Sequence, residues 1–316
     1  MKSRQSVHTL ILVMTLQAII VAQSVSQIPS NSWSSGIPLP TARQGAATGL
    51  IKGKVYVVSG ATNTVVTAVN EVYTVSKNTW TTGASIPTPR FVPASAVVNN
   101  ILYVIGGNSG SGVLNTVEAY DPLTNKWSTK ASMPTARDSC TAVAVKGLIY
   151  VVGGFSPSGG RLTTVERYDP VANTWTAEAP LKVGKSLPAL AALGSTIIAA
   201  GGYTNSNSVT SDNEGYSVAK NSWKTLASIP TARQGTCTAP IKGQMYVAGG
   251  SNGAVLTAHE AYGATSKTWT TVASIPKAIV NPASATSGGK LFCIGGSNDG
   301  RLFAGSVFGD VQIYQP

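Results

Sequence analysis

The chemically reactive side chains that recur most regularly are basic residues, each placed ten positions after a tryptophan. Four of the five stand in Pro-Thr-Ala-Arg or Pro-Thr-Pro-Arg segments, and the sixth equivalent position carries Ile279 instead. The five are Arg43, Arg90, Arg137, Lys185 and Arg233. If the fold gathers them at one end of the molecule, they form a ring of cations that binds an acidic ligand, because guanidinium groups donate paired hydrogen bonds to carboxylates.

The sequence lacks the residues that metal binding or nucleophilic catalysis would need. Apart from His8 near the N-terminus, the chain has one histidine, His259, and no Cys or His cluster at metal-ligand spacing. His259 follows no recognisable nucleophile motif. We therefore expect no metal, no other cofactor and no Ser-His-Asp catalysis. Charged residues are only 11% of the chain and no run of Lys or Arg occurs, so nucleic acid is not an expected partner.

The three cysteines are Cys140, Cys237 and Cys293. An odd and low count excludes a disulfide framework. One pair could form, but each cysteine falls in a different sequence repeat, so free thiols are the favoured state. The sequence thus predicts three buried free thiols of low reactivity.

Internal repeats decide which elements position these side chains. All six tryptophans recur at spacings of 46 to 48 residues, in step with a small-Gly pair and a tyrosine. In the third repeat, Leu148-Ile149-Tyr150-Val151-Val152 is a continuous apolar strand ending at a Gly-Gly pair, and Thr164 to Tyr168 alternates as a half-buried strand. Four strands in about 47 residues make one propeller blade. The sequence therefore predicts an all-β, six-bladed propeller with four antiparallel strands per blade.

These residues resemble the kelch repeat. Val-Tyr-Val-Val-Ser-Gly at 55–60 and Leu-Tyr-Val-Ile-Gly-Gly at 102–107 fit its apolar run and glycine pair, and Tyr120 and Trp127 complete the pattern. The resemblance extends from about residue 31 to the end of the chain. It implies a propeller, and in kelch ubiquitin-ligase adaptors arginines at the family position that the five repeated cations occupy here help to grip acidic peptides. Copper oxidases with a kelch-like propeller need His and Tyr ligands that this chain does not supply.

The two ends of the chain predict how the ring closes. Trp33 belongs to an outer strand that precedes the first complete repeat, whereas the last repeat stops just after Tyr314. We expect residues 31 to 36 to pair with the strand of Tyr314, which removes the open edge of the last blade.

A repeated glutamate offers a second interpretation of the cations. Two residues before each repeated tyrosine stand Glu71, Glu118, Glu166, Glu214 and Glu260, and the sixth position carries Gln312. Gln312 falls in the same blade as Ile279, so this blade lacks both charges. The favoured interpretation is an ion pair inside each blade, with Lys185 and Glu214 the weakest because lysine lacks the planar fork. Binding of an acidic ligand by the same cations is the alternative.

The loops after the glycine pairs are the variable part of each repeat. The longest, residues 297 to 309, contains Asp299, Arg301 and Phe303, and exposed aromatic residues beside charges suit binding. These three residues and the five cations are the candidate ligand-binding residues.

The N-terminus has the pattern of an export signal. Lys2 and Arg4 precede an apolar stretch from Leu10 to Ala22, shorter than the roughly 20 residues that span a bilayer. We predict a signal peptide over residues 1–22, cleaved after Ala22 or Ser24, a linker over 23–30 and the propeller over 31–316. The protein would be secreted or periplasmic, without a membrane span, and a monomer.

Two functions from different classes remain open. The favoured one is a non-enzymatic binding or scaffold module with a protein or glycan ligand, its ligand face formed by the loops after the glycine pairs and by the segments that carry the cations. The alternative is a periplasmic sugar isomerase of the sialic-acid mutarotase type, which uses Arg, Glu and Gln side chains without metal. No motif in the sequence selects this enzyme.

Overall fold

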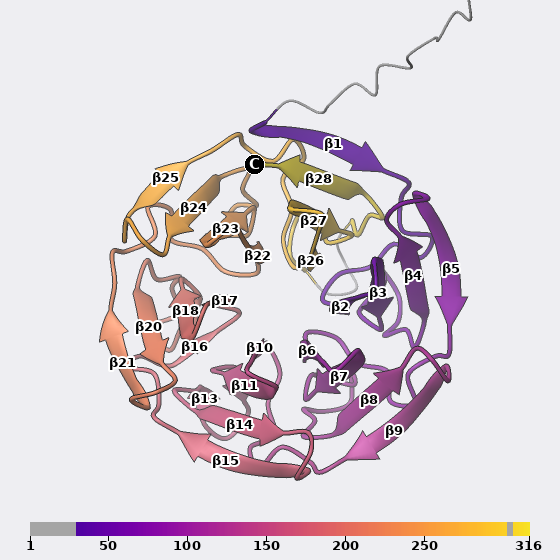
Figure 1. Ribbon diagram of the computed structural model, residues 1–316, viewed down its shortest axis with the longest axis horizontal. Coiled ribbons are helices and arrows are strands. Elements are labelled where there is room, and N and C mark those ends of the chain that lie inside the picture. Colours follow the sequence, from indigo (N-terminus) through magenta and orange to yellow (C-terminus); the bar gives the residue numbers. More distant parts are fainter. Residues whose placement is uncertain (1–29, 302–305) are drawn as a thin grey trace, which may run out of the picture.

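The computed structural model describes residues 30–301 and 306–316, which form six four-stranded antiparallel sheets arranged as a ring. Each sheet is one blade, and the four strands of a blade follow one another from the ring axis outward (Figure 1). The predicted six-bladed kelch-type propeller is confirmed. None of the described residues forms a helix that could cross a membrane.

Two strands of each blade lie close to the axis. The innermost strands of blades 1 to 6 are β2 (Ala47–Ile51), β6 (Ala94–Val98), β10 (Thr141–Val145), β17 (Ala189–Leu193), β22 (Cys237–Ile241) and β26 (Ala283–Ser287). The second strands are β3 (Lys54–Val58), β7 (Ile101–Ile105), β11 (Leu148–Val152), β18 (Thr196–Ala200), β23 (Gln244–Ala248) and β27 (Lys290–Ile294).

The other two strands form the outer part of the blade. The third strands are β4 (Asn70–Thr74), β8 (Val117–Asp121), β14 (Val165–Asp169), β20 (Asn213–Ser217), β24 (His259–Gly263) and β28 (Val311–Gln315). The outermost strands are β5 (Thr79–Gly83), β9 (Lys126–Lys130), β15 (Thr174–Glu178), β21 (Ser222–Thr225), β25 (Trp269–Thr271) and, in blade 6, β1 (Ser32–Gly36). Two short ribbons outside the blades pair β12 (Phe155–Ser156) with β13 (Gly160–Arg161), and β16 (Lys185–Ser186) with β19 (Tyr203–Thr204).

Burial explains the strand sequences. The second strands are buried on both faces, which is why they read as unbroken apolar runs rather than as alternating patterns. The outermost strands alternate, because one face packs on the neighbouring blade and the other meets solvent. The apolar core lies between blades: one cluster joins Ala47 and Val58 of blade 1 to Leu102 and Val104 of blade 2.

The N-terminal strand closes the ring as predicted. Strand β1 pairs antiparallel with β28, and Trp33 lies opposite Tyr314. The two rings are 5.1 Å apart between centroids. Blade 6 is therefore built from both ends of the chain, and the open edge of β28 is covered.

Neighbouring blades are joined by a repeated set of three polar groups. The tryptophan Nε1 donates to a backbone carbonyl of the preceding blade at 2.8 to 2.9 Å in all six junctions. In five of the six junctions an asparagine two residues before the tryptophan accepts from the repeated tyrosine hydroxyl and from an amide of the preceding blade. Asn125, for example, accepts from Tyr120 at 2.6 Å and from the Ala84 amide at 2.7 Å. These contacts give the repeated Tyr and Trp a structural role.

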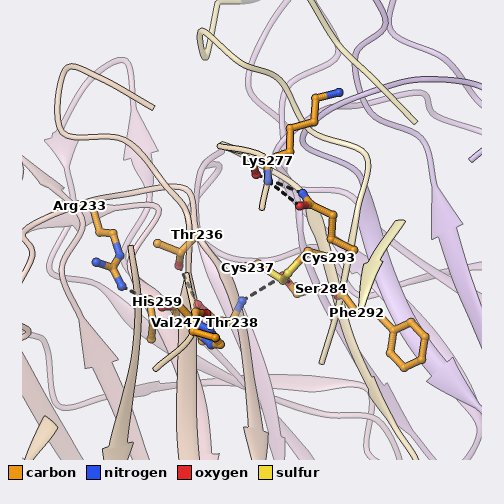
Figure 2. Close-up of a disulfide and its surroundings, with 12 residues drawn as sticks. Arg233, Thr236, Cys237, Thr238, Val247, His259, Lys277, Ser284, Phe292 and Cys293 are labelled. Atoms are coloured by element: carbon orange, nitrogen blue, oxygen red, sulfur yellow. Dashed lines mark hydrogen bonds between the residues drawn. A yellow bond between two sulfur atoms is a disulfide. The ribbon is translucent and has the colours of Figure 1, made fainter. Parts of the chain in front are cut away.

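The prediction of three free thiols is wrong. Cys237 of β22 and Cys293 of β27 form a disulfide that joins blade 5 to blade 6 (Figure 2). The inner strand of one blade packs against the second strand of the next, so cysteines of neighbouring repeats come into contact despite a separation of 56 residues. Cys140, just before β10, is a buried free thiol whose pKa is raised by burial.

Several sequence predictions concern residues that the structure does not describe. The signal peptide over residues 1–22 and nearly all of the linker over 23–30 lie outside the described residues, and so does Phe303. Ser30 is the first described residue, and the chain enters the ring next to β1.

Candidate functional site

One end of the ring, here called the loop face, carries the segments that the sequence singled out. It consists of the loops after the second strands and of the segments that lead into the first strands. Short antiparallel bridges join the two sets within a blade, such as those of Gln44 with Ala61 and of Asp138 with Phe155. The five repeated cations and the variable loops therefore share one face.

Each repeated cation forms an ion pair with the repeated glutamate of its own blade. Arg90 Nη2 is 2.5 Å from Glu118, Arg137 Nη1 is 2.5 Å from Glu166, and Arg233 Nη2 is 2.7 Å from Glu260. Arg43 pairs with Glu71, and Lys185 with Glu214 at 3.0 Å. The predicted pairing is confirmed in all five blades, and the lysine pair has the longest contact.

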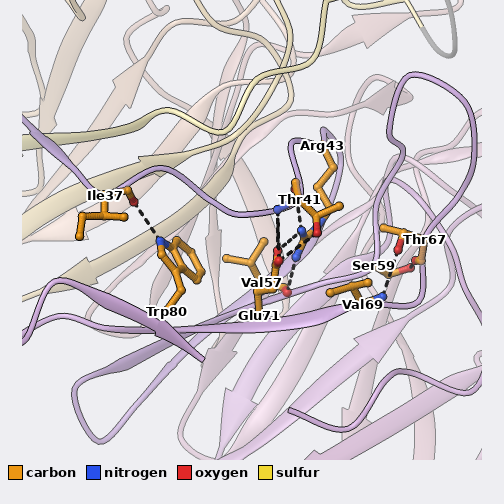
Figure 3. A network of polar contacts seen from close by, with 9 residues as sticks. All are labelled: Ile37, Thr41, Arg43, Val57, Ser59, Thr67, Val69, Glu71 and Trp80. Carbon is orange, nitrogen blue, oxygen red and sulfur yellow. Dashed lines mark hydrogen bonds and ion pairs between the residues drawn. The ribbon is translucent and has the colours of Figure 1, made fainter. Parts of the chain in front are cut away.

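In the four blades that carry it, the Pro-Thr-x-Arg segment supplies further partners of the pair, as Figure 3 shows for blade 1. The Thr41 hydroxyl and amide donate to Glu71, at 2.9 and 3.1 Å. Arg43 also donates to the carbonyl of Val57 at 2.7 Å. In other blades the hydroxyl of Thr135 donates to Glu166 at 2.8 Å, and that of Thr231 donates to Glu260 at 2.7 Å. The motif thus satisfies a buried carboxylate, a role that the sequence analysis did not assign to its threonine.

The backbone of each repeated cation joins its blade to the preceding one. The Lys185 carbonyl accepts from the Gly154 amide at 2.9 Å, and the equivalent bond recurs at the other five junctions. A Cβ on Gly153 would lie 2.3 Å from this carbonyl, and its φ of +63° is left-handed. The first glycine of the pair is needed because the next blade approaches the backbone so closely.

None of the five cationic side chains has exposed surface; their relative exposure is 0%. Burial lowers the pKa of Arg43, Arg90 and Arg233, and the paired glutamates oppose that shift. Their charges are used inside the blades, so the structure brings the five together around the ring without offering a free cation to a ligand.

The centre of the loop face is closed by a ring of backbone hydrogen bonds. Six residues, each two positions after a repeated cation or Ile279, donate to the carbonyl of their counterpart in the preceding blade at 2.7 to 3.3 Å. They are Gly45, Val92, Ser139, Leu187, Gly235 and Asn281, and all have a left-handed φ between 45° and 63°. The axial cavity beneath has a volume of about 200 Å³ and no charged lining residue. It offers hydroxyl groups that already have partners: Ser95 Oγ donates to the Thr48 carbonyl at 2.9 Å, and Thr48 Oγ1 donates to the Tyr56 carbonyl at 3.1 Å.

A cluster of charged, aromatic and amide side chains lies on the loop face over blades 3 and 4. The Arg161 guanidinium carbon lies 4.7 Å from the ring centre of Tyr203 and 5.6 Å from that of Phe155. Arg161 Nη1 donates to Asn207 Oδ1 at 3.2 Å, and its amide donates to Asn205 Oδ1 at 2.8 Å. Phe155, Arg161 and Tyr203 are half-buried, and both asparagines are exposed. This cluster, hereafter the Arg161 cluster, is a held cation between two aromatic faces.

The loop of blade 6 is arranged differently. Arg301 and Asp299 are exposed, and the Arg301 amide donates to Asp299 Oδ1 at 3.0 Å. The Arg301 carbonyl accepts from Gln44 Nε2 at 2.7 Å. These two predicted residues lie together on the loop face, in a different blade from the Arg161 cluster.

His259 is a core residue. It has no exposed surface, its Nδ1 donates to the Ala273 carbonyl at 2.9 Å, and it packs on Trp33, Tyr246 and Tyr314. Burial lowers its pKa to about 4. In the part of the chain that the structure describes, no three His, Cys, Asp or Glu side chains are grouped to hold a metal ion.

Sequence reasoning named the loops of the Arg161 cluster as variable but singled out none of its residues. A signal was available: the position after the glycine pair is aromatic only in blades 3 and 4, as Phe155 and Tyr203. Two neighbouring aromatic residues at a repeated loop position, with an arginine six residues after the first, indicate a site that the other blades lack.

Comparisons with known proteins agree with this architecture. A family model described as the KLHDC2/KLHL20/DRC7 Kelch-repeats domain matches residues 20–189, over half of the chain. Among solved structures, "Structure of YjhT" superposes with a TM-score of 0.75 at 18% identity, over 88% of this chain and 96% of that one, a similarity of fold. No curated protein matches the sequence significantly. Six blades built from the Gly-Gly, Tyr and Trp repeat, together with the family match, show that the chain belongs to the kelch-repeat family.

Proposed function

We propose that the protein is an exported binding module that holds an acidic segment of a protein ligand on its loop face. The kelch fold supports a binding or scaffold role in general. The specific part of the proposal is the place and the chemistry: the Arg161 cluster is the anchor, and the loops around it form the rest of the contact.

The observation that carries the proposal is the arrangement of Arg161 between Phe155 and Tyr203. The guanidinium group is held in place before any ligand arrives, so less side-chain entropy is lost on binding. Among the described residues only Asn207 accepts from this group, and its Nε is buried without an acceptor, so a ligand would bind through the two Nη groups. The remaining donors suit a carboxylate, which a planar guanidinium binds with paired hydrogen bonds.

The surroundings of the cluster add polar contacts of both kinds. Asp138 lies beside it through its bridge with Phe155, and its carboxylate accepts from Asn108 at 3.1 Å. The exposed Asn205 and Asn207 offer amide donors and acceptors. Aromatic anchors with a central arginine and a polar rim are typical of residues that dominate protein interfaces.

The experiment is a screen of a peptide display library and a glycan array with the wild-type protein, followed by affinity measurements on the hits. Arg161→Ala and Tyr203→Ala are expected to weaken an acidic peptide by about 1–3 kcal/mol each. Lys77→Ala, which removes a positive charge from the opposite face, is the matched control and should bind as the wild type.

Two results would contradict the proposal. If peptide hits bind Arg161→Ala as tightly as the wild type, Arg161 is not the anchor. If Arg301→Ala loses affinity instead, the site lies in blade 6. Hits on the glycan array alone would replace the protein ligand with a carbohydrate.

Export is part of the same proposal, and it rests on Lys2, Arg4 and the apolar stretch that ends at Ala22. The intact mass of the secreted protein should correspond to a chain that begins after Ala22 or Ser24. Recovery of the full-length mass from a membrane fraction would contradict cleavage. Gel filtration with light scattering should give the mass of a monomer.

A further inference from the structure

Blade 5 departs from the other blades at the junction that carries the repeated asparagine. Asn31, Asn78, Asn125, Asn173 and Asn221 occupy this position elsewhere, and blade 5 has Lys267. The backbone stays the same, with a left-handed φ of 60° at Lys267 and 44° to 55° at the asparagines. Asparagine tolerates this conformation better than lysine does.

The exchange removes an acceptor and leaves its donors in place. In the other five blades the asparagine Oδ1 accepts from the tyrosine hydroxyl at 2.6 to 2.8 Å and from an amide of the preceding blade at 2.7 to 2.9 Å. The equivalent donors of blade 5 are the Tyr262 hydroxyl and the Ala227 amide. The Tyr262 hydroxyl is buried without a partner, whereas Ala227 is exposed and its amide has no acceptor among the described residues.

A small cleft between blades 4 and 5 opens at this place. It has a volume of about 60 Å³, and Ala227 follows the lining residue Leu226 in the chain. The lining residues are Leu193, Thr196, Ile198, Lys224, Leu226, Tyr262, Ala264 and Lys267. This exceeds the ~10–15 Å³ that one water molecule needs, so the cleft has room for a small group. Lys224 and Lys267 are both exposed, and the Lys267 ammonium donates to the Ala264 carbonyl at the cleft wall. The cleft thus combines two cations, a buried hydroxyl and no acidic side chain.

The surface around the cleft is also positive. The end of the ring opposite the loop face, here called the hairpin face, is made of the turns between first and second and between third and fourth strands. A backbone bond from the Ala264 amide to the Gly243 carbonyl, 3.0 Å long, holds the two turns of blade 5 together. Two carboxylates, those of Asp121 and Asp169, accept from turn amides of blades 2 and 3, away from the cleft. The turns themselves contain six exposed lysines: Lys52, Lys77, Lys146, Lys220, Lys242 and Lys267. A field of one sign raises the local concentration of anions.

We propose that the cleft between blades 4 and 5 is an oxyanion-binding site, in which a sulfate, phosphate or carboxylate oxygen takes the place of the missing asparagine Oδ1. The Tyr262 hydroxyl and the Ala227 amide donate to that oxygen, and Lys224 and Lys267 neutralise its charge. The site lies on the face opposite the Arg161 cluster and does not rest on the function proposed for the loop face.

Inorganic sulfate is the probe, titrated into ¹⁵N-labelled protein at constant ionic strength with chloride as the reference anion. The Ala227 amide resonance should move downfield and saturate with sulfate but not with chloride. Lys267→Asn restores the repeat, so its Ala227 resonance should lie downfield without sulfate, its sulfate affinity should fall at least about tenfold, and its Tm should rise by roughly 2 °C. Tyr262→Phe should weaken sulfate about 3- to 10-fold.

The matched control is Lys77→Asn, which makes the same substitution in the corresponding turn of blade 1, where Asn78 already occupies the repeated position. It should bind sulfate as the wild type does. Equal sulfate affinity in Lys267→Asn and wild type, or an Ala227 resonance that does not respond in the wild type, overturns the proposal. Dextran sulfate then identifies the source: binding much tighter than sulfate per charged group assigns the site to a polymer, and equal binding assigns it to a free anion.

Discussion

The carbonyl oxygen of Arg137 accepts a hydrogen bond of 3.0 Å from the amide of Gly107 in the preceding blade. The guanidinium group of the same arginine lies 2.5 Å from Glu166 in its own blade. One repeated residue therefore fixes the interior of a blade through its side chain and the junction with the neighbouring blade through its backbone. This double structural role accounts for its recurrence without any ligand.

Replacement of Arg137 by alanine should lower the free energy of unfolding by about 3 kcal/mol, because it leaves the Glu166 carboxylate buried without its cation. Denaturant unfolding followed by tryptophan fluorescence measures the change. Arg161→Ala, which removes a half-exposed guanidinium group, should cost well under that amount.

Blade 6 supplies the control for this experiment, since Ile279 and Gln312 replace the pair there and the Gln312 oxygen accepts from the Lys277 amide at 2.9 Å. The double variant Arg137→Ile with Glu166→Gln copies that blade. It should recover most of the stability lost in Arg137→Ala, because no uncompensated charge remains. A double variant as unstable as the single one would show that the arginine acts through its bonds to backbone carbonyls rather than through the charge pair.

The fold could be predicted from the sequence because each blade repeats the same pattern of strands, turns and packing residues. The spacing of Trp80 and Trp127 gave the blade length, and the unpaired ends at Trp33 and Tyr314 gave the closure. The disulfide could not be read in the same way. It depends on how the inner strand of one blade faces the second strand of the next, and repeat periodicity contains no information about which side chains meet across that junction.

The candidate site was only partly predictable. The repeated positions of Arg43 and Glu71 indicated an ion pair, and the structure confirms it. Arg161 could not be found by repetition, because it occurs once and its position depends on Phe155 and Tyr203 from two different blades. Binding residues of a repeat protein are by nature the ones that break the repeat, so they are the hardest to separate from ordinary loop variation.

The disulfide between Cys237 and Cys293 should be visible by intact mass spectrometry. Reduction with a thiol reagent should raise the mass by the two hydrogen atoms that the thiols gain. Titration of the denatured, unreduced protein should find the thiol of Cys140 and no other. The bond closes a loop across a separation of 56 residues, so its removal by Cys237→Ala with Cys293→Ala should cost up to about 4 kcal/mol. Three titratable thiols without reductant would contradict the bond.

Ring closure should depend on Trp33 more than on any other residue of β1. Its Nε1 donates to the Ala273 carbonyl at 2.8 Å and its ring packs on His259 and Tyr314. Trp33→Ala should lower the free energy of unfolding by about 3 kcal/mol, and deletion of residues 30 to 36 should cost more and cause aggregation through the uncovered edge of β28. Ser35→Ala, an exposed position of the same strand, is the control and should have no measurable effect. A soluble, fully stable deletion variant would show that β1 is dispensable.

The stability of the propeller should fall in mild acid because of His259. Burial lowers the pKa of this imidazole to about 4, below the usual value of 6.5 that applies in the unfolded chain. The unfolded state therefore binds a proton more readily, so stability is full above pH 6.5 and declines as the pH falls toward 4. The difference corresponds to about 3 kcal/mol at most. Denaturant unfolding at pH 7 and at pH 4.5 measures this loss of stability. The control is the variant His259→Phe, because the buried glutamates contribute equally to the pH dependence of the variant and of the wild type. The variant should lose less stability than the wild type over this interval. The same loss in both proteins would mean that His259 does not titrate between the two states.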